Sequence, residues 1–163
     1  MIQLIENWID QTLDFYSDEK KSCVCFSAPF KGYYPKDLLS RSYYVVADEL
    51  PRIDLPELRR EGLGGFIDMD FIGITYKNTY FIKKDYENDL ALHFHELVHV
   101  VQWQYLGAKA FIARYIDELK TNGYAASPLE EMARTLENHF TLKNHFTNEE
   151  MVLDIPEYVK EKI

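Results

Sequence analysis

The segment that decides the fold of this chain is DLALHFHELVHVVQWQYLG, residues 89–107. Apolar residues surround its few polar ones, so a helix formed here is apolar around most of its circumference and is predicted to be buried. Asp89 or Asn88 is suited to cap the start of this helix, and Gly107 is suited to end it. Polar side chains in a buried helix must be paired, hydrogen-bonded or bound to a metal, because an unpaired buried charge is costly.

The polar side chains of this segment follow the pattern His-Glu-x-x-His, from His95 to His99. Two histidines four residues apart lie on one face of a helix, so both can reach one metal ion at the usual Zn–N distance of roughly 2.0–2.1 Å. Glu96 falls within roughly the same third of the helical circumference, where a carboxylate can take a proton from a metal-bound water. The alternative is a pair of satisfied core histidines with Glu96 in a salt bridge. We favour the metal, because three polar groups otherwise converge on one face without a reason.

A catalytic zinc usually has three protein ligands, so a third must come from elsewhere in the chain. The downstream candidates are Glu118, Glu130, Glu131, Glu137, His139 and His145. On a helix that begins at Ser127 and Pro128, Glu130 lies at the edge of the apolar face, whereas Glu131 points away from it. Glu137 lies near the same edge and could support the site. The pattern therefore favours Glu130 as the third ligand, with Glu131 second.

Glu130 also has an interpretation that needs no metal. Ser127 precedes it by three residues and Pro128 occupies the first helical position, which together form a capping box. One carboxylate does not serve well as both a helix cap and a metal ligand. The sequence leaves both roles open, with a modest preference for the ligand.

Composition restricts the class of protein. The chain has 163 residues, of which 47% are hydrophobic and 15% aromatic, as expected for one globular domain. Its net charge of −9 argues against nucleic acid and anionic membrane surfaces as partners, and fits a basic protein or peptide better. No stretch reaches the roughly 20 apolar residues that a membrane span needs.

The first residues of the chain are not expected to form a signal peptide. Residues 2–16 predict an amphipathic surface helix without the basic and apolar regions of a signal peptide. Cys23 and Cys25 alternate along a predicted strand, which is poor geometry for a disulfide, and we interpret both as buried thiols. We therefore expect a cytoplasmic location.

The order of predicted elements indicates the fold class. Strands are predicted at residues 23–26 and 42–47, and a hairpin within residues 66–83 turns at Lys77 and Asn78. Helices are predicted at residues 90–106, 108–119 and 127–142, and Pro156 breaks the remaining tail. This order predicts an α+β fold, with a mostly antiparallel sheet in the N-terminal half and a helical half that carries the His-Glu-x-x-His helix.

The motifs resemble the gluzincin class of zinc metallopeptidases. The resemblance rests on HELVHVVQ at residues 95–102, GY at residues 123–124 and PLE at residues 128–130, and the hairpin before the helix resembles the sheet edge along the cleft of that class. It implies a single zincin-like domain over residues 1–163, a Zn²⁺ ion held by His95, His99 and Glu130, and a protein or peptide substrate. Glu96 would then be the general base of peptide hydrolysis.

Two further expectations follow from this resemblance. The tetrahedral oxyanion of the reaction needs a donor, for which we choose Tyr124, with Tyr115 and His93 as alternatives. The competing interpretation, favoured by the 12 tyrosines of the chain, is that Tyr124 only packs among aromatic residues. The chain also departs from the class, because Arg134 stands four positions after Glu130, where many gluzincins have an acidic residue. A zinc-binding interaction module without hydrolytic activity, and a metal-free helical domain, are the competing hypotheses.

Overall fold

The sheet of this protein is small and mixed. The computed structural model describes residues 1–145 and 152–163. Its strands are β1 (Lys21–Ser22), β2 (Tyr43–Ala47), β3 (Gly73–Tyr76) and β4 (Thr79–Lys83), in the order β1-β2-β4-β3. The pairings of β1 with β2 and of β3 with β4 are antiparallel, whereas β2 and β4 are parallel. The α+β class is confirmed, but the five-residue parallel pairing at the centre makes the sheet mixed.

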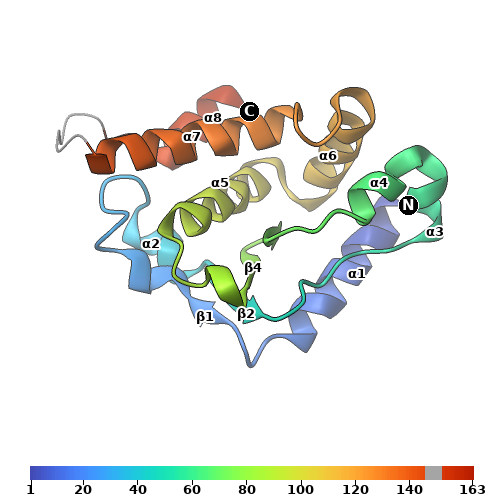
Figure 1. The fold of residues 1–163 in the computed structure, drawn as a ribbon, viewed down its shortest axis with the longest axis horizontal. Helices are drawn as coiled ribbons and strands as arrows, with labels where there is room; N and C mark the ends of the chain where they lie inside the picture. The colour runs from blue at the N-terminus through green and yellow to red at the C-terminus, as the bar shows by residue number, and fades with distance from the viewer. Residues whose placement is uncertain (146–151) are drawn as a thin grey trace.

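Helices account for most of the remaining chain (Figure 1). They are α1 (Ile2–Phe15), α2 (Lys36–Ser40), α3 (Pro56–Leu58), α4 (Gly64–Ile67), α5 (Leu90–Leu106), α6 (Ala108–Asn122), α7 (Pro128–His145) and α8 (Ile155–Lys162). Helix α5 lies in the middle, where it contacts β3 and β4 on one side and α7 and α8 on the other. None of the helices in the described residues is both long and apolar enough to cross a membrane.

Helix α5 forms and ends as the sequence predicts. The Asp89 carboxylate accepts hydrogen bonds from the backbone N–H groups of Ala91 and Leu92. Gly107 adopts φ 77° after the last residue, a conformation that favours glycine. Every residue of α5 from Leu92 to Trp103 is buried. The helix is therefore fixed by contacts on all sides.

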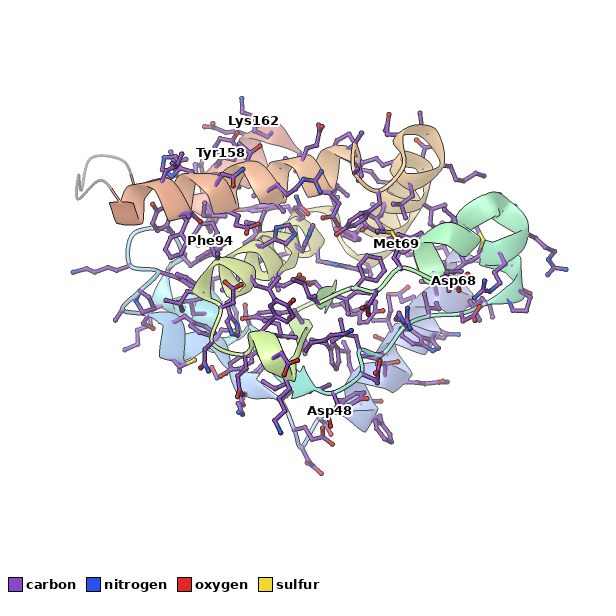
Figure 2. The ribbon with its side chains drawn as sticks, in the orientation of Figure 1. Asp48, Asp68, Met69, Phe94, Tyr158 and Lys162 are labelled. Atoms are coloured by element: carbon purple, nitrogen blue, oxygen red, sulfur yellow. The ribbon has the colours of Figure 1, made fainter. Side chains whose placement is uncertain are left out.

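Two apolar clusters hold the molecule together, and α5 contributes to both. Toward α7, the ring of Phe94, which Figure 2 labels, stacks on Phe140 with 4.6 Å between the ring centroids. Toward α6, the Trp103 ring stacks on Phe111 at 4.0 Å. Such contacts add about 0.5–1.5 kcal/mol each beyond the burial of apolar area. They fix the positions of α6 and α7 relative to the polar face of α5.

The predicted strand at residues 23–26 is wrong. Cys23–Phe26 forms a short 3-10 helix, because the Ser22 side chain accepts the N–H of Val24 and closes a tight turn. Cys23 is fully buried, whereas Cys25 is exposed, so only one of the two thiols is buried as expected. Both are free thiols.

The hairpin at residues 66–83 is confirmed only in its second half. Tyr76 pairs with Thr79 across the predicted turn at Lys77 and Asn78. Strand β3 begins only at Gly73, because residues 64–67 form α4 and residues 68–72 belong to neither a helix nor a strand. Lys77 has φ 57° and donates to Glu6 and Asp10 of α1, so the turn is tied to the N-terminal helix.

Candidate metal centre

Three buried side chains converge from α5 and α7. The Nε2 atoms of His95 and His99 are 3.2 Å apart, and Glu130 Oε2 lies 3.5 Å from the first and 3.4 Å from the second. The three residues are only 9%, 6% and 4% exposed. The structure thus brings together the three residues that the sequence predicts as ligands, although Glu130 comes 35 positions after His95.

The triangle of donor atoms has the size that a tetrahedral zinc requires. Ligand bonds of roughly 2.0–2.1 Å at tetrahedral angles separate the donor atoms by roughly 3.3 Å. The three observed separations lie within 0.2 Å of that value. Each residue offers one ligand atom, and three protein ligands leave one tetrahedral position for water.

The other ring nitrogen of each histidine is committed to a hydrogen bond. His95 Nδ1 lies 2.9 Å from Glu137 Oε2, and a carboxylate only accepts, so Nδ1 carries the proton. His99 Nδ1 lies 2.8 Å from Gln102 Oε1. Gln102 Nε2 donates to the Leu129 carbonyl at 2.9 Å, which fixes the orientation of the amide. In the neutral form of each ring, which is the form that binds a metal, the Nε2 atom therefore presents a lone pair.

Glu130 completes this set of acceptors. Its Oε1 atom accepts a hydrogen bond from the Tyr115 hydroxyl at 2.7 Å, whereas Oε2 is buried without a hydrogen-bond partner. Three lone-pair atoms that face one another out of contact with water are costly unless a proton or a metal cation lies between them. The chemistry of the donor set therefore fits a divalent metal ion.

The charges around this point attract a cation. Burial opposes protonation of His95, but the neighbouring carboxylates of Glu130 and Glu137 outweigh burial and raise its pKa to about 10. Burial also works against a charged Glu130, yet His99 and His95 hold the pKa of that carboxyl well below its usual range. In the metal-free protein, a proton on His95 thus partly replaces the positive charge that a metal ion would supply.

The capping interpretation of Glu130 does not hold. The Ser127 hydroxyl and the Leu129 N–H both donate to Glu118 Oε2, at 2.8 and 2.9 Å. Glu118, from α6, therefore caps α7 and leaves Glu130 free to face the histidines. Glu131, the second candidate, is exposed and does not belong to this group of converging side chains. The side chain of His145 lies outside the described residues.

Glu96 lies beside the ligands and contacts the sheet. Its Oε2 atom accepts a hydrogen bond from Thr75 of β3 at 2.6 Å. Gly73 faces the same carboxylate so closely that a Cβ atom there would overlap Glu96 Oε1. Burial raises the pKa of Glu96, although His95 and His99 act in the opposite direction. A carboxylate with a raised pKa is a better proton acceptor at neutral pH.

Tyr124 lies at the edge of the site among aromatic rings. Its ring is 5.4 Å from that of Phe71 and 6.0 Å from that of Phe66. Burial, followed by the charge of Glu130, raises the pKa of Tyr124, so its hydroxyl keeps its proton. Tyr124 and Glu130 line the same cavity.

The two alternatives to Tyr124 have other partners. The Tyr115 hydroxyl is used by Glu130. His93 lies away from this cavity, with Nδ1 2.7 Å from the Tyr80 hydroxyl and Nε2 2.8 Å from the Glu87 carbonyl. Tyr124 thus stays the predicted oxyanion donor.

Arg134 adds a cation near the site. Its Nη1 atom lies 4.0 Å from Glu130 Oε2, and Nη2 donates to the Ala125 carbonyl at 2.5 Å. Arg134 stands where an acidic residue was expected to orient a histidine. Glu137, about one helical turn later, makes this contact with His95 instead. Both histidines thus have an oriented second nitrogen.

Sequence reasoning missed several residues that position the site. Gln102 carries a readable signal, because it follows His99 by three residues and so lies on the same helical face. Thr75, Tyr115 and Glu118 act from other elements and carry no such local signal.

A comparison of the chain with protein-family models, curated proteins and solved structures finds no match.

Proposed function

We propose that this protein is a zinc-dependent metallopeptidase with a zincin-like fold. One observation carries the proposal: three buried lone-pair atoms from His95, His99 and Glu130 lie 3.2–3.5 Å apart, and a hydrogen bond orients the second nitrogen of each histidine. The edge position of β3 beside α5 supports the zincin-like fold.

Glu96 has the position and chemistry of the general base. A bound zinc would lower the pKa of its water to about 7 and polarise the scissile carbonyl. Glu96 accepts the proton of that water as the oxygen attacks the carbonyl carbon. The carbon–nitrogen bond then breaks, and Glu96 delivers the proton to the leaving nitrogen. Tyr124 donates a hydrogen bond to the oxygen that carries the developing negative charge.

A zinc-binding module without hydrolytic activity is the second candidate. The contact between Arg134 and Glu130 favours it, because a guanidinium near the carboxylate reduces the negative charge that balances the metal. The two candidates share the metal ligands and differ in whether Glu96 transfers protons.

The first test is the zinc content of the purified protein after loose metal is removed. We expect about one zinc per chain in the wild type and in Glu131→Gln, and a large loss in Glu130→Gln, since only Glu130 faces the histidines. Equal zinc content in the two variants would contradict the assignment of Glu130 as the third ligand. Absence of zinc from the wild type even after reconstitution would contradict the metal site itself.

The second test separates hydrolysis from zinc binding. Glu96→Gln removes the base but keeps the size of the side chain, so we expect zinc to be retained and peptide cleavage to fall by about 100-fold or more. Cleavage of a peptide mixture, followed by mass spectrometry, measures this. Unchanged turnover in Glu96→Gln would rule out the proposed mechanism, and zinc binding without any cleavage by the wild type would favour the second candidate.

A further inference from the structure

Arg134 is a cation beside the candidate metal centre. Its Nη1 atom lies 4.0 Å from Oε2 of Glu130, the oxygen that faces the two histidines. Among the described residues, no other lysine or arginine lies within that distance of Glu130. The side chain of Arg134 is 36% exposed, whereas that of Glu130 is only 5% exposed. The guanidinium is therefore accessible from solvent next to a ligand atom that is buried.

The connection between α6 and α7 fixes the position of this guanidinium. Nη2 of Arg134 donates a hydrogen bond to the Ala125 carbonyl at 2.5 Å. An arginine side chain has five N–H donors, and this bond uses one of them. Within the described part of the chain Arg134 makes no second hydrogen bond. Most of its donors thus remain available to another acceptor.

The charge of Arg134 is poorly neutralised compared with that of Arg59. Arg59 contacts two carboxylates, of Asp54 and Asp68, each at 2.7 Å. The single acid near Arg134 is instead the expected third metal ligand, at the longer distance of 4.0 Å. A metal bound by the same oxygen would share its negative charge. The guanidinium then lacks a full counter-ion.

The cavity on the metal centre contains no comparable cation. This cavity of about 120 Å³ adjoins the expected ligands and is lined mainly by apolar side chains, including Ile5 and Ile9 of α1. None of the described residues that line it is a lysine or an arginine. Arg134 therefore acts on the centre from outside the cavity, as a separate feature of the site.

A carboxylate is the substrate group that suits this guanidinium. The planar fork of donors matches the two oxygens of a carboxylate, and such charged hydrogen bonds are about twice as strong as neutral ones. The separation of 4.0 Å between Nη1 of Arg134 and Oε2 of Glu130 sets the scale. One residue of extended peptide spans about 3.3–3.6 Å. A carboxylate one residue away from a carbonyl group at the ligands can therefore reach Arg134.

We infer that Arg134 binds a carboxylate of the peptide substrate within one residue of the scissile bond. This carboxylate is the C-terminal group of the peptide or the side chain of an aspartate or glutamate. The inference rests on the proposed function, because it concerns the substrate of the same site. It goes further in naming the substrate class, which is peptides with a carboxylate beside the cleaved bond.

Peptide binding to zinc-loaded Glu96→Gln tests the inference without requiring cleavage. The probes are acetyl-trialanine with a free C-terminus, the same peptide as an amide, and an amide that ends in aspartate. Calorimetry measures each Kd. We expect a carboxylate peptide to bind about 10-fold or more tightly than the neutral amide, and the peptide that does so identifies the terminal or side-chain source. Equal binding of all three would overturn the inference.

A matched pair of variants separates Arg134 from the metal, which also attracts carboxylates. Arg134→Gln removes the charge beside the centre, whereas Arg41→Gln removes that of an exposed arginine paired with Asp37. Both are combined with Glu96→Gln. We expect the preference for the carboxylate peptide to be lost in the first and kept in the second, at equal zinc content.

A preference that survives in zinc-loaded Arg134→Gln would overturn the inference. If Arg134→Gln does not fold, Arg134→Lys takes its place, because it keeps the charge but not the planar fork. We then expect the preference to weaken by several-fold. An unchanged preference in Arg134→Lys would also overturn the inference.

Digestion of peptide libraries separates this inference from the proposed function. We expect zinc-loaded wild type to cleave about 10-fold or more faster beside a carboxylate than elsewhere, with cleavage sites read by mass spectrometry in libraries with free and amidated C-termini. Cleavage without this preference would overturn the inference and leave the proposed function intact. If no peptide is cleaved, the proposed function fails, and the binding comparison alone decides about Arg134.

Discussion

At the scale of single residues, the site depends on which atoms are left without a partner. Both histidine Nδ1 atoms have an acceptor, and Glu130 Oε2 has no hydrogen-bond donor. The free lone pairs therefore all face one point. Gln102 is central to this arrangement, because it joins His99 of α5 to the Leu129 carbonyl of α7.

Replacing Gln102 tests this arrangement without touching a ligand. In Gln102→Leu the His99 Nδ1–H and the Leu129 carbonyl lose their partner, so we expect zinc affinity to fall by about 10- to 100-fold. Gln104→Leu is the matched control, because Gln104 is exposed on the same helix. Zinc competition with a chromogenic chelator measures the affinity. Equal affinities of the two variants would show that Gln102 does not orient His99.

At the scale of elements, strand β3 limits the space around Glu96, the proposed general base. Thr75 holds one oxygen of Glu96, and the missing side chain of Gly73 leaves room for the other. The close packing of β3 on α5 thus determines where the carboxylate points.

A single methyl group at Gly73 should displace this carboxylate. A displacement of about 1 Å can cost about 100-fold in rate, so we expect such a loss of kcat/KM in Gly73→Ala, with zinc content unchanged. Gly65→Ala is the control, since a Cβ atom there meets nothing within 4 Å. Full activity of Gly73→Ala would mean that the position of Glu96 relative to β3 is unimportant for catalysis.

At the scale of the whole molecule, the candidate metal centre joins the two apolar clusters. Its histidines belong to α5, which packs into both clusters, and Glu130 belongs to α7. A ligand that binds only the folded state stabilises it, by about 4 kcal/mol at a concentration 1,000 times its Kd. Removal of zinc should therefore lower the melting temperature of the whole protein.

The size of this effect should depend on pH. The pKa of His95 in the folded metal-free protein is about 10, above its ordinary value of 6.5, so protonation stabilises that form fully below pH 6.5. This stabilisation is lost as the pH rises toward 10. Zinc instead binds deprotonated histidines. We thus expect the difference in melting temperature between zinc-loaded and chelator-treated protein to grow from pH 6 to pH 9. A difference that stays constant would contradict the role of His95.

The sequence by itself determined the parts of this protein that depend on a few neighbouring residues. These are the boundaries of α5, the common face of His95, Glu96 and His99, and the turn between β3 and β4. Helical periodicity, capping and turn formation act over two to four residues, so a single segment contains their full signal. The tight turn at Cys23 was missed, because alternating residues of that kind also suit a strand.

Only the tertiary structure decided between the two roles of Glu130. The local pattern from Ser127 to Glu130 suits a cap, but Glu118 arrives from the preceding helix and takes that role. Whether Glu118 reaches α7 depends on how α6 packs against α5, which no local pattern encodes. The hydrogen bond from Thr75 to Glu96 and the cavity beside α1 likewise depend on how distant segments pack together. Contacts between distant segments follow from packing of the whole chain, and they convert a helical motif into a candidate metal centre.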